Sequence, residues 1–418
     1  MSAPHIPVDT LDRPHRAPRA RRAPRAGNGD GPRGKQLPRH VLASWRRAQS
    51  ALLVHLALRL VGVGVVGLWG HRKGIGLHEI LATRWDSVYY LNIADHGYAS
   101  AMVPACHIGG PTCKLAFFPV YPLLTRGLSA VTGAPADWAG WAISLVASLL
   151  AAWGIFAVAE KLYNARVAFY AVALYAVVPH ALVLSMAYTE PVFIALAAWA
   201  VYAVLTRRWL TAGVLALLVG ATRPSGAAVV AAVVLCALWA LFTGRERSGA
   251  RWPVARLWAA VLIAPLGWFA FFAWVGHRMG RWDGYFVEQS QWGSTFDGGV
   301  YTAQRLRELV TQPGLTLNQV VVSATVVTAL VLLVLLARQR PPAAVWIYTA
   351  VLVLIAVGGA GFFHSKARFL LPAFPLLFPF AVALARARRT TVYWVLGSAT
   401  LVSALYSGYL TLIWNRSP

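Results

Sequence analysis

The sequence predicts an all-α protein that crosses a membrane many times. Of its 418 residues, 58% are hydrophobic and only 12% are charged, and the mean hydropathy is +0.58. A soluble globular chain usually has about a quarter charged residues. Long apolar stretches recur from residue 50 onward, and a helix needs about 20 apolar residues to span a bilayer. The chain therefore belongs among polytopic membrane proteins.

Residues 1–48 are predicted to form a disordered basic cytoplasmic tail. The first 50 residues carry eleven Arg or Lys against three Asp, about a third of the formal net charge of +24. The stretch RPHRAPRARRAPRAGNGDGPRGK lacks the apolar content needed to fold. A polybasic arm beside a membrane span marks the cytoplasmic side and can touch anionic lipid. This interpretation is favoured over nucleic-acid binding and over a signal peptide.

Eleven apolar stretches are predicted to span or partly span the membrane within residues 49–418. They cover residues 50–70, 138–159, 167–184, 188–205, 209–222, 224–243, 254–276, 319–337, 343–361, 369–385 and 391–413. His55 and Arg59 interrupt the first stretch one helical turn apart, so they are expected to face protein or water. The sequence ATRPSG breaks the helix after residue 222, so 209–243 is predicted to be a broken hairpin whose tip lines a cavity.

The charge distribution predicts which side of the membrane holds the chemistry. The connections EKLYNAR, TRRW, GRERSGARWPVAR, RQRPP and ARARR are short and basic, which is typical of cytoplasmic loops. The other side has two long loops, 71–137 and 277–318. It also has most of the 14 acidic residues, namely Glu79, Asp86, Asp95, Asp137, Glu190, Asp283, Glu288, Asp297 and Glu308. Any active site is therefore expected on the extracytoplasmic side of the cell membrane.

The first outer loop is predicted to contain an amphipathic helix from Gly76 to Ala94, because apolar residues recur there at three-to-four spacing. In its sequence RWDSVYY, Asp86 follows Arg84 and Trp85. Asp95 lies nine residues further on, about half a turn around an unbroken helix. The two carboxylates then cannot form a close pair, which disfavours a paired-carboxylate glycosidase. Taken alone, RWDSVYY is explained most simply as an interfacial aromatic belt with a local ion pair.

The same loop contains two cysteines and several histidines. Cys106 and Cys113 flank a Gly-Gly-Pro turn and are candidates for a disulfide if the loop faces an oxidising space. Metal binding through these cysteines and His107 is the less favoured alternative, because no fourth ligand is evident. The other histidines of the loop lack the tight spacing of a helix-borne metal site. No cofactor is assigned, and a divalent metal stays open.

Further polar residues lie at the outer ends of predicted spans. Glu190 occurs in SMAYTEP and Arg223 in ATRPSG, while FFHSKARFLLPAFP contains His364, Lys366 and Arg368. Each has a simple structural explanation alone, but their occurrence on one side together favours a polar cavity. In such a cavity, cations could hold the phosphate of a lipid-linked sugar, and a carboxylate could take a proton from the acceptor hydroxyl.

The order of six motifs carries a family resemblance. TRWDSVYYLNIADHGY, LAFFPVYPLL, MAYTEPVF, ATRPSG, GYFVEQSQWG and HSKARFLLPAFPLL lie within residues 50–385. Together they resemble the PIG-V-like integral membrane mannosyltransferases, relatives of GPI mannosyltransferase 2, in a chain of bacterial composition. The resemblance implies a C-type glycosyltransferase fold and inverting transfer from polyprenyl-phosphate mannose at the outer membrane face. It implies a key acid in the first outer loop, matched by Asp86, and a second polar position, matched by Asp95. An Asp-X-Asp motif is missing, so metal dependence stays open.

Asp86 is therefore predicted to be the catalytic base or an acceptor-orienting carboxylate, with Tyr89 supporting the sugar or the loop. The expected substrate-binding residues are Arg84, Trp85, Tyr90, Asp95, Glu190, Arg223, Gln289, Gln291, Trp292, His364, Lys366 and Arg368. The expected partners are a lipid-linked sugar donor, membrane lipids and a glycolipid, polysaccharide or protein acceptor. The alternative functions are a transporter or lipid-linked sugar flippase, which would show repeats with matched broken helices, and a non-catalytic scaffold.

Overall fold

The computed structural model describes residues 37–98, 113–244, 251–414, 416 and 417. Most of the predicted basic tail and Cys106 lie outside the described residues, so the disulfide between Cys106 and Cys113 stays a prediction. Cys236 is a free thiol. From Ser44 onward, the helices belong to one compact unit, Ser44–Pro418.

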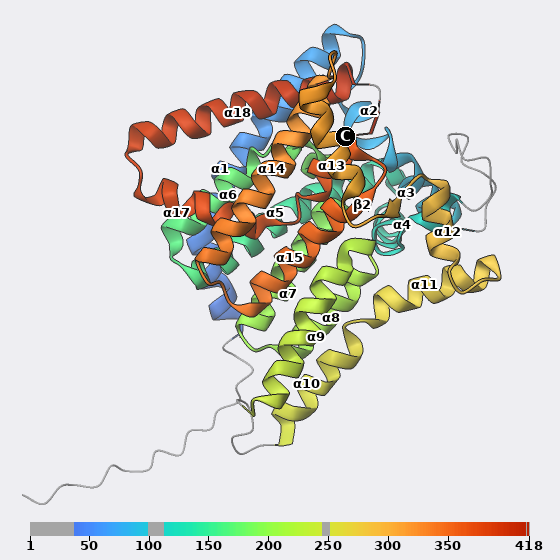
Figure 1. Cartoon of the computed structure of the whole chain (residues 1–418), viewed down its shortest axis with the longest axis vertical. Helices are drawn as coiled ribbons and strands as arrows, with labels where there is room; N and C mark the ends of the chain where they lie inside the picture. The colour runs from blue at the N-terminus through green and yellow to red at the C-terminus, as the bar shows by residue number, and fades with distance from the viewer. Residues whose placement is uncertain (1–36, 99–112, 245–250, 415, 418) are drawn as a thin grey trace, which may run out of the picture. The chain divides into compact units, whose positions relative to one another are not determined.

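The described residues are mostly helical (Figure 1). The chain begins with α1 (Leu37–Arg72), α2 (Leu77–Ala82), α3 (Asp86–His96), η2 (Cys113–Ala116), α4 (Val120–Thr132), α5 (Ala136–Leu162), α6 (Ala165–Ala176), η3 (Ala181–Ser185), α7 (Glu190–Leu205), α8 (Trp209–Gly220), η4 (Pro224–Gly226) and α9 (Ala227–Phe242). It continues with α10 (Arg251–Ile263), α11 (Leu266–Met279), α12 (Gly284–Gln291), β1 (Thr295–Phe296), α13 (Val300–Thr311), α14 (Leu317–Arg338), α15 (Ala343–Gly358), β2 (Gly359–Ala360), η5 (Phe363–Ser365), α16 (Lys366–Phe369), η6 (Phe374–Leu377), α17 (Phe378–Arg386) and α18 (Arg389–Leu412).

The apolar helices match the predicted spans. Within the described residues, six helical segments are long and apolar enough to cross a membrane: Ser44–Arg72, Ala136–Leu162, Pro224–Phe242, Val254–Met279, Leu317–Arg338 and Arg389–Leu412. A pair bent by 77°, Phe363–Phe369 with Phe374–Arg386, is a broken span or a re-entrant loop, and α6, α7, α8 and α15 are shorter apolar helices. Each of the eleven predicted stretches therefore corresponds to one of these segments. The protein is a multi-pass membrane protein.

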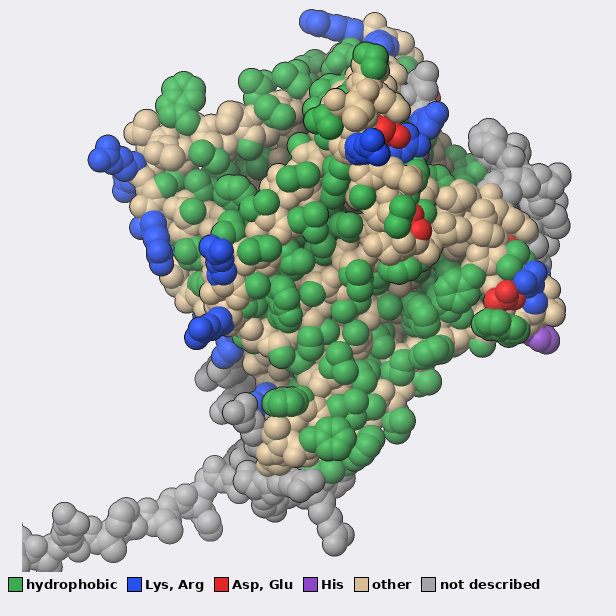
Figure 2. Space-filling view, in the orientation of Figure 1, with side chains coloured by type: hydrophobic (Ala, Val, Ile, Leu, Met, Phe, Trp, Pro, Cys, Tyr) green, Lys and Arg blue, Asp and Glu red, His purple; other side chains and the backbone are tan. Residues whose placement is uncertain are grey.

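The outward surface of these helices is apolar. Figure 2 shows hydrophobic side chains over most of the visible face, with Lys and Arg toward its margins. Large apolar side chains are exposed along α8, α14 and α15, among them Val214, Val327, Val331, Val334 and Leu354. A water-soluble chain rarely exposes a patch of this extent. This surface fits the hydrocarbon of a bilayer.

Helices in the interior approach closely because their contact faces carry small residues. Helix α5 packs on α6 and α7, and α7 packs on α8. A Cβ added to Gly154 of α5 would lie 2.8 Å from the Cβ of Ala198 of α7, closer than two carbons can approach. Small residues are the usual means by which membrane helices bring their backbones together.

The two polar residues within the first span face protein, as predicted. His55 is 1% exposed and Arg59 is 5% exposed. The Nη2 and Nε atoms of Arg59 donate to Ser185 Oγ at 2.8 and 3.2 Å, and His55 Nε2 lies 3.3 Å from Ser148 Oγ. These contacts supply hydrogen-bond partners to groups that would be costly to bury alone.

Replacement of Ser185 with Ala is expected to lower the thermal stability of the protein. The guanidinium of Arg59 stays buried but loses a partner, which costs about 1–3 kcal/mol. The detergent-solubilised protein is heated in steps and passed over a gel-filtration column. The measurement is the temperature at which the area of the folded-protein peak falls to half. Ser398→Ala removes an exposed hydroxyl from α18 and should leave that temperature unchanged. Equal shifts in both variants would contradict the expectation.

The ends of the helices define two opposite faces of the membrane domain. Helices α1 and α5 run antiparallel, since Trp153 Nε1 donates to Ser44 Oγ while His55 meets Ser148 further along. At one end, Arg47 Nε lies 2.7 Å from Glu160 Oε1. The chain leaves the opposite end of α1 toward α2 and α3. The basic connection that follows α5 and the first outer loop therefore lie at opposite ends of these two helices.

The predicted amphipathic helix is broken into two. Helix α2 ends at Ala82 and α3 begins at Asp86. Between them Trp85 has φ 54° and ψ −125°, a backbone conformation that L residues with side chains seldom adopt. The expectation of one unbroken helix is wrong at this point. The break places Asp86 at the first residue of a helix.

A small strap connects the second outer loop to the end of α15. Strands β1 and β2 pair antiparallel, with Thr295 opposite Ala360 and Phe296 opposite Gly359. Lys366 Nζ donates to the carbonyls of Ala356 and Gly359 at 2.8 and 2.6 Å. A lysine at a helix C-terminus satisfies carbonyls that have no partner within the helix. The strap therefore fixes the start of the segment that carries Arg368.

Candidate active site

Asp86 is held by both its backbone and its side chain. Its amide N donates to the hydroxyl of Tyr188 at 3.3 Å, and its carboxylate Oδ2 lies 2.8 Å from Arg368 Nη1. The side chain is 26% exposed, so the carboxylate is oriented yet open to a small molecule. The strained conformation of Trp85 immediately before it fixes the direction in which α3 begins.

Glu190 is the second carboxylate of this site, and it is buried. It opens α7, and its side chain is 1% exposed. Pro191 follows within the first turn, where a missing N–H costs nothing. A carboxylate at a helix N-terminus is stabilised by the free amides and the helix dipole. Its burial requires cations close by, and two arginines supply them.

Arg368 bridges the two carboxylates. Its Nη1 contacts Asp86, and its Nε lies 3.2 Å from Glu190 Oε1. The guanidinium carbon lies 5.3 Å from the ring centre of Tyr188 and 5.4 Å from that of Phe369, within the range of cation–π attraction. Only 8% of the side chain is exposed. Arg368 therefore joins the first outer loop to the start of α7.

Arg223 completes the charge balance from the broken hairpin. It precedes η4 in an extended conformation, and its Nη1 lies 2.5 Å from Glu190 Oε1 and 2.9 Å from Thr189 Oγ1. Its side chain is 13% exposed. We call Asp86, Glu190, Arg223 and Arg368 the carboxylate–arginine cluster. The cluster brings together four residues that the sequence marked separately, and its formal charge is zero.

Three residues at the cluster were not predicted. Tyr188 and Thr189 lie in the SMAYTEP motif beside Glu190, so their position next to a marked residue was the available signal. Ser417 had no signal in the sequence. Its Oγ lies 3.3 Å from Asp86 Oδ1, 3.1 Å from Arg368 Nη1 and 3.4 Å from Tyr188 OH.

Aromatic residues extend from the cluster along α3. The hydroxyl of Tyr90 lies 3.4 Å from Thr189 Oγ1, and burial raises the pKa of Tyr90 to about 12. Tyr90 is therefore protonated at neutral pH and is a poor proton acceptor. The ring centres of Tyr89 and Phe117 are 4.7 Å apart, and Trp292 lies 5.2 Å from Tyr89. Trp292 thus brings the second outer loop to α3.

Other predicted site residues lie away from the cluster. Arg84 Nη2 pairs with Glu79 Oε1 at 2.7 Å. Asp95 and Gln291 are exposed, while Gln289 is half-buried. These positions give no contact to the four charged groups.

The basic segment around Arg368 divides between two roles. The ammonium of Lys366 is directed at the carbonyls that end α15, as described above, and is 2% exposed. His364 is half-buried, and its ring lies 6.3 Å from that of Trp414. Arg368 alone of the three contacts a carboxylate of the cluster.

The carboxylate pairing differs from the one considered in the sequence. Asp95 lies on the same helix as Asp86 but points to solvent, so those two carboxylates do not pair. Asp86 instead shares Arg368 with Glu190. One of these carboxylates is open and the other is buried between guanidinium groups. The arrangement suits one reacting carboxylate and one that holds the arginines in place.

The donor set of the cluster does not fit a divalent cation. Both carboxylates are already paired with guanidinium groups, whereas Mg²⁺ and Mn²⁺ require several oxygen ligands that are free to coordinate. Within the part of the chain that the structure describes, no group of three or more His, Cys, Asp or Glu is close enough to hold a metal ion.

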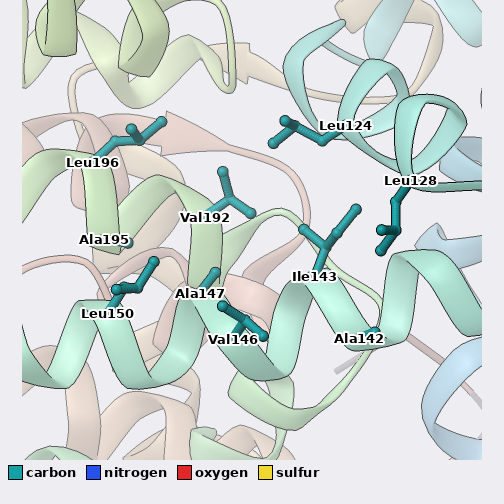
Figure 3. A pocket seen from close by; sticks show the side chains of 10 residues that line it. All are labelled: Leu124, Leu128, Ala142, Ile143, Val146, Ala147, Leu150, Val192, Ala195 and Leu196. Atoms are coloured by element: carbon teal, nitrogen blue, oxygen red, sulfur yellow. The ribbon is translucent and has the colours of Figure 1, made fainter. Parts of the chain in front are cut away.

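An apolar groove lies along the helix that begins at Glu190. It has a volume of about 380 Å³ and runs between α4, α5 and α7 (Figure 3). Its lining consists of Leu124, Leu128, Ala142, Ile143, Val146, Ala147, Leu150, Val192, Ala195 and Leu196. Val192 is two residues from Glu190, and it packs in the same hydrophobic cluster as Tyr89 and Tyr90. Helix α7 therefore contributes its first residue to the charged cluster and later residues to the groove.

Comparison with known protein families finds one matching profile. The profile of the PMT_2 family, dolichyl-phosphate-mannose-protein mannosyltransferase, matches residues 116–269, a segment that contains Glu190 and Arg223. None of the curated proteins compared matches the sequence. The match covers a minority of the chain and leaves Asp86 and Arg368 outside it.

The fold is similar to that of solved membrane glycosyltransferases. ArnT from Cupriavidus metallidurans, bound to undecaprenyl phosphate, aligns over 85% of this chain and 64% of its own, with a TM-score of 0.53 and 14% identity. The apo Archaeoglobus fulgidus oligosaccharyltransferase covers 88% of this chain and 57% of its own, at a TM-score of 0.49 and 15% identity. The oligosaccharyltransferase AglB from Archaeoglobus fulgidus, in complex with an inhibitory peptide and a dolichol-phosphate, covers 90% of this chain and 57% of its own. Its TM-score is 0.49 and its sequence identity is 12%.

The chain covers less than two thirds of the length of each of these three proteins. The likeness to ArnT shows the fold, which is the C-type fold of integral membrane glycosyltransferases. The predicted fold class is thereby confirmed.

Proposed function

We propose that this protein is an inverting glycosyltransferase that moves a mannosyl residue from a polyprenyl-phosphate donor to a hydroxyl acceptor. The observation that carries the proposal is the arrangement of Asp86. One oxygen of its carboxylate is bound by Arg368, and the other accepts a hydrogen bond from the hydroxyl of Ser417. An oriented, partly open carboxylate of this kind is what a general base requires. The PMT_2 match and the undecaprenyl phosphate bound to ArnT support the donor class.

The proposed reaction needs one base. The acceptor oxygen attacks C1 of the sugar from the face opposite the phosphate, and the bond between C1 and the phosphate oxygen breaks. The acceptor proton passes to Asp86 Oδ1, and the leaving group is the polyprenyl phosphate. Because a phosphate monoester is a stable anion, no strong acid is needed to protonate it. The configuration at C1 is inverted.

The two arginines are proposed to stabilise the phosphate. Each guanidinium has five N–H donors, and the contacts within the cluster use only some of them. An arginine binds phosphate through two parallel hydrogen bonds. His364 lies close enough in sequence to Arg368 to assist. Lys366 is proposed instead to position this segment, since its ammonium is bound by carbonyls.

The apolar groove is proposed to take the lipid of the donor. Its lining side chains are all apolar, and they include Val192, two residues after the buried Glu190. A polyprenyl chain in the groove would gain about 25 cal/mol for each square ångström of apolar surface that it buries. This position would bring the phosphate at the head of the lipid to the arginines.

Mannose, the PIG-V-like relationship and the membrane orientation belong to the same proposal. The motif order within residues 50–385 supports the first two. The basic connection EKLYNAR follows α5 at the end opposite the first outer loop, which supports a cytoplasmic location for that end. The active site then faces the extracytoplasmic side, where a glycolipid, a polysaccharide or a protein can supply the hydroxyl.

Transfer from radiolabelled polyprenyl-phosphate mannose by the purified protein tests the proposal. The acceptor panel comprises membrane glycolipids, envelope polysaccharide and a hydroxyl-containing protein fraction. Transfer to at least one acceptor is expected, and polyprenyl-phosphate glucose should be a poorer donor. Translocation of the lipid-linked sugar across vesicles without any transfer would overturn the proposal and favour the flippase.

Removal of divalent cations is expected to leave this transfer unchanged. The carboxylates of the cluster are compensated by arginines rather than by a metal. The measurement compares the initial rate before and after dialysis against EDTA, with readdition of Mg²⁺ and Mn²⁺ in turn. Loss of transfer in EDTA and recovery on readdition would contradict the expectation.

A further inference from the structure

The segment after α18 brings a hydroxyl to the carboxylate–arginine cluster. Helix α18 ends at Leu412, whose carbonyl accepts from Lys73 Nζ at 3.0 Å. The amide of Trp414 donates to the carbonyl of Tyr409 at 2.9 Å, and its ring lies beside His364. From there the chain reaches Asp86 with Ser417. These contacts hold the segment at Trp414 and at Ser417.

The position of Ser417 corresponds to that of a substrate alcohol. Its Oγ donates to Asp86 Oδ1 at 3.3 Å and accepts from Arg368 Nη1 at 3.1 Å. A general base must lie within hydrogen-bond distance of the hydroxyl that it deprotonates, with somewhat longer contacts before substrate binds. The oxygen that Ser417 meets is the one left free by Arg368. Among the hydrogen bonds of the described residues, the one to that oxygen comes from Ser417.

We propose that Ser417 occupies the acceptor subsite and holds the place of the acceptor hydroxyl. This inference rests on the proposed function. The acceptor must displace the segment after α18 to reach Asp86, so this segment acts as a competitive inhibitor within the same chain. The contact that the acceptor breaks consists of a few hydrogen bonds to polar groups, each of which contributes modestly in water.

Shortening the chain after Ile413 tests the proposal with water as the probe. Hydrolysis of polyprenyl-phosphate mannose, measured as released mannose, is expected to rise about three- to tenfold. The rise should disappear when Asp86→Asn is added. A synthetic peptide with the sequence of residues 413–418 should suppress the hydrolysis again. Gel filtration establishes that the shortened protein is folded.

The variant Ser417→Ala distinguishes a segment that competes with the acceptor from one that positions Asp86. If the segment competes, this variant should hydrolyse the donor at least as fast as the full chain, because the carboxylate oxygen is freed. If Ser417 instead positions Asp86, hydrolysis should fall, which would overturn the proposal. A hexose found on Ser417 by mass spectrometry would also overturn it, since the segment would then be a substrate.

The outcomes distinguish the inference from the function on which it rests. Transfer to panel acceptors by the full chain, with hydrolysis unaffected by shortening and by the peptide, overturns the inference and leaves the function standing. Absence of both hydrolysis and transfer in the full and shortened proteins overturns both. A higher rate only in the shortened protein supports both.

Discussion

Replacement of Asp86 with Asn is expected to lower sugar transfer at least about a hundredfold while the protein keeps its fold. The amide can retain one contact to Arg368 but cannot accept a proton from the acceptor hydroxyl. A positioned general base typically contributes a factor of about 10²–10⁴ to the rate. The measurement is initial transfer from radiolabelled polyprenyl-phosphate mannose at saturating donor, with gel filtration to establish folding.

Asp95→Asn is the matched control for this prediction. It removes a carboxylate of the same type from the same helix, nine residues away, where the side chain is exposed. Transfer by this variant should stay within about twofold of the unaltered protein, since exposed substitutions away from special features have small effects. Full transfer by Asp86→Asn, or equal losses in the two variants, would show that Asp86 is not the base.

The number and order of the spans could be predicted because they depend on composition. A bilayer requires long apolar helices with all backbone groups satisfied internally, so each span carries its own signal. The break at ATRPSG carries one too, since Pro224 cannot continue a helix. Residues 209–242 accordingly form α8, η4 and α9, with Arg223 at the break.

The break before Asp86 had no comparable signal. The apolar spacing from Gly76 to Ala94 continues through it, and Trp85 adopts a positive φ without being glycine. Such a conformation depends on contacts from elsewhere in the chain. The hydroxyl of Tyr188, which accepts from the amide of Asp86, is one of them.

The pairing of charges also depends on contacts between distant segments. The sequence marks Glu190, Arg223 and Arg368 as polar groups at membrane depth, but all three were expected to meet substrate. The structure brings them to one another and to Asp86. Lys366 has the same charge as Arg368 two residues away, yet it meets carbonyls. Local spacing cannot distinguish these two roles, because the partners of both side chains come from other parts of the fold: the end of α15 for Lys366, and α3 and α7 for Arg368.

The pairing also explains how the buried carboxylate of Glu190 affects the partly exposed carboxylate of Asp86, since both contact Arg368. Glu190 is 1% exposed, and its charge holds Arg368 and Arg223 close together. Arg368 then orients Asp86 through Oδ2, and Oδ1 accepts a hydrogen bond from Ser417. A phosphate that approaches the arginines would compete with Glu190 for their donors. The contacts within the cluster can therefore hold its geometry without a bound donor.

Replacement of Arg368 with Gln is expected to impair both stability and transfer. Glu190 is 1% exposed and loses one of its two cations, while Asp86 loses the group that orients it. Removal of one partner of a buried ion pair costs about 3–5 kcal/mol. Transfer should fall at least about a hundredfold even at temperatures where the variant is folded. The measurements are the thermal midpoint in detergent and the initial transfer rate.

Arg84→Gln provides the matched control, because Arg84 is a predicted site arginine whose pair with Glu79 is exposed. Exposed ion pairs contribute about 0–1 kcal/mol, so this variant should keep its stability and most of its transfer. Arg368→Lys should recover part of the stability and little of the transfer, since an ammonium cannot bridge both carboxylates as a guanidinium does.

A double-mutant cycle with Glu190→Gln separates the two roles of Arg368. If Arg368 bridges the two carboxylates, the stability losses of Arg368→Gln and Glu190→Gln should couple by about 0.5–3 kcal/mol. In the double variant, residue 190 is neutral, so the loss of Arg368 leaves no unpaired buried charge at that position. Transfer should stay low in the double variant, since Asp86 is still without its arginine. Additive stability losses would contradict the bridge, and recovery of transfer would contradict the orientation of Asp86 by Arg368.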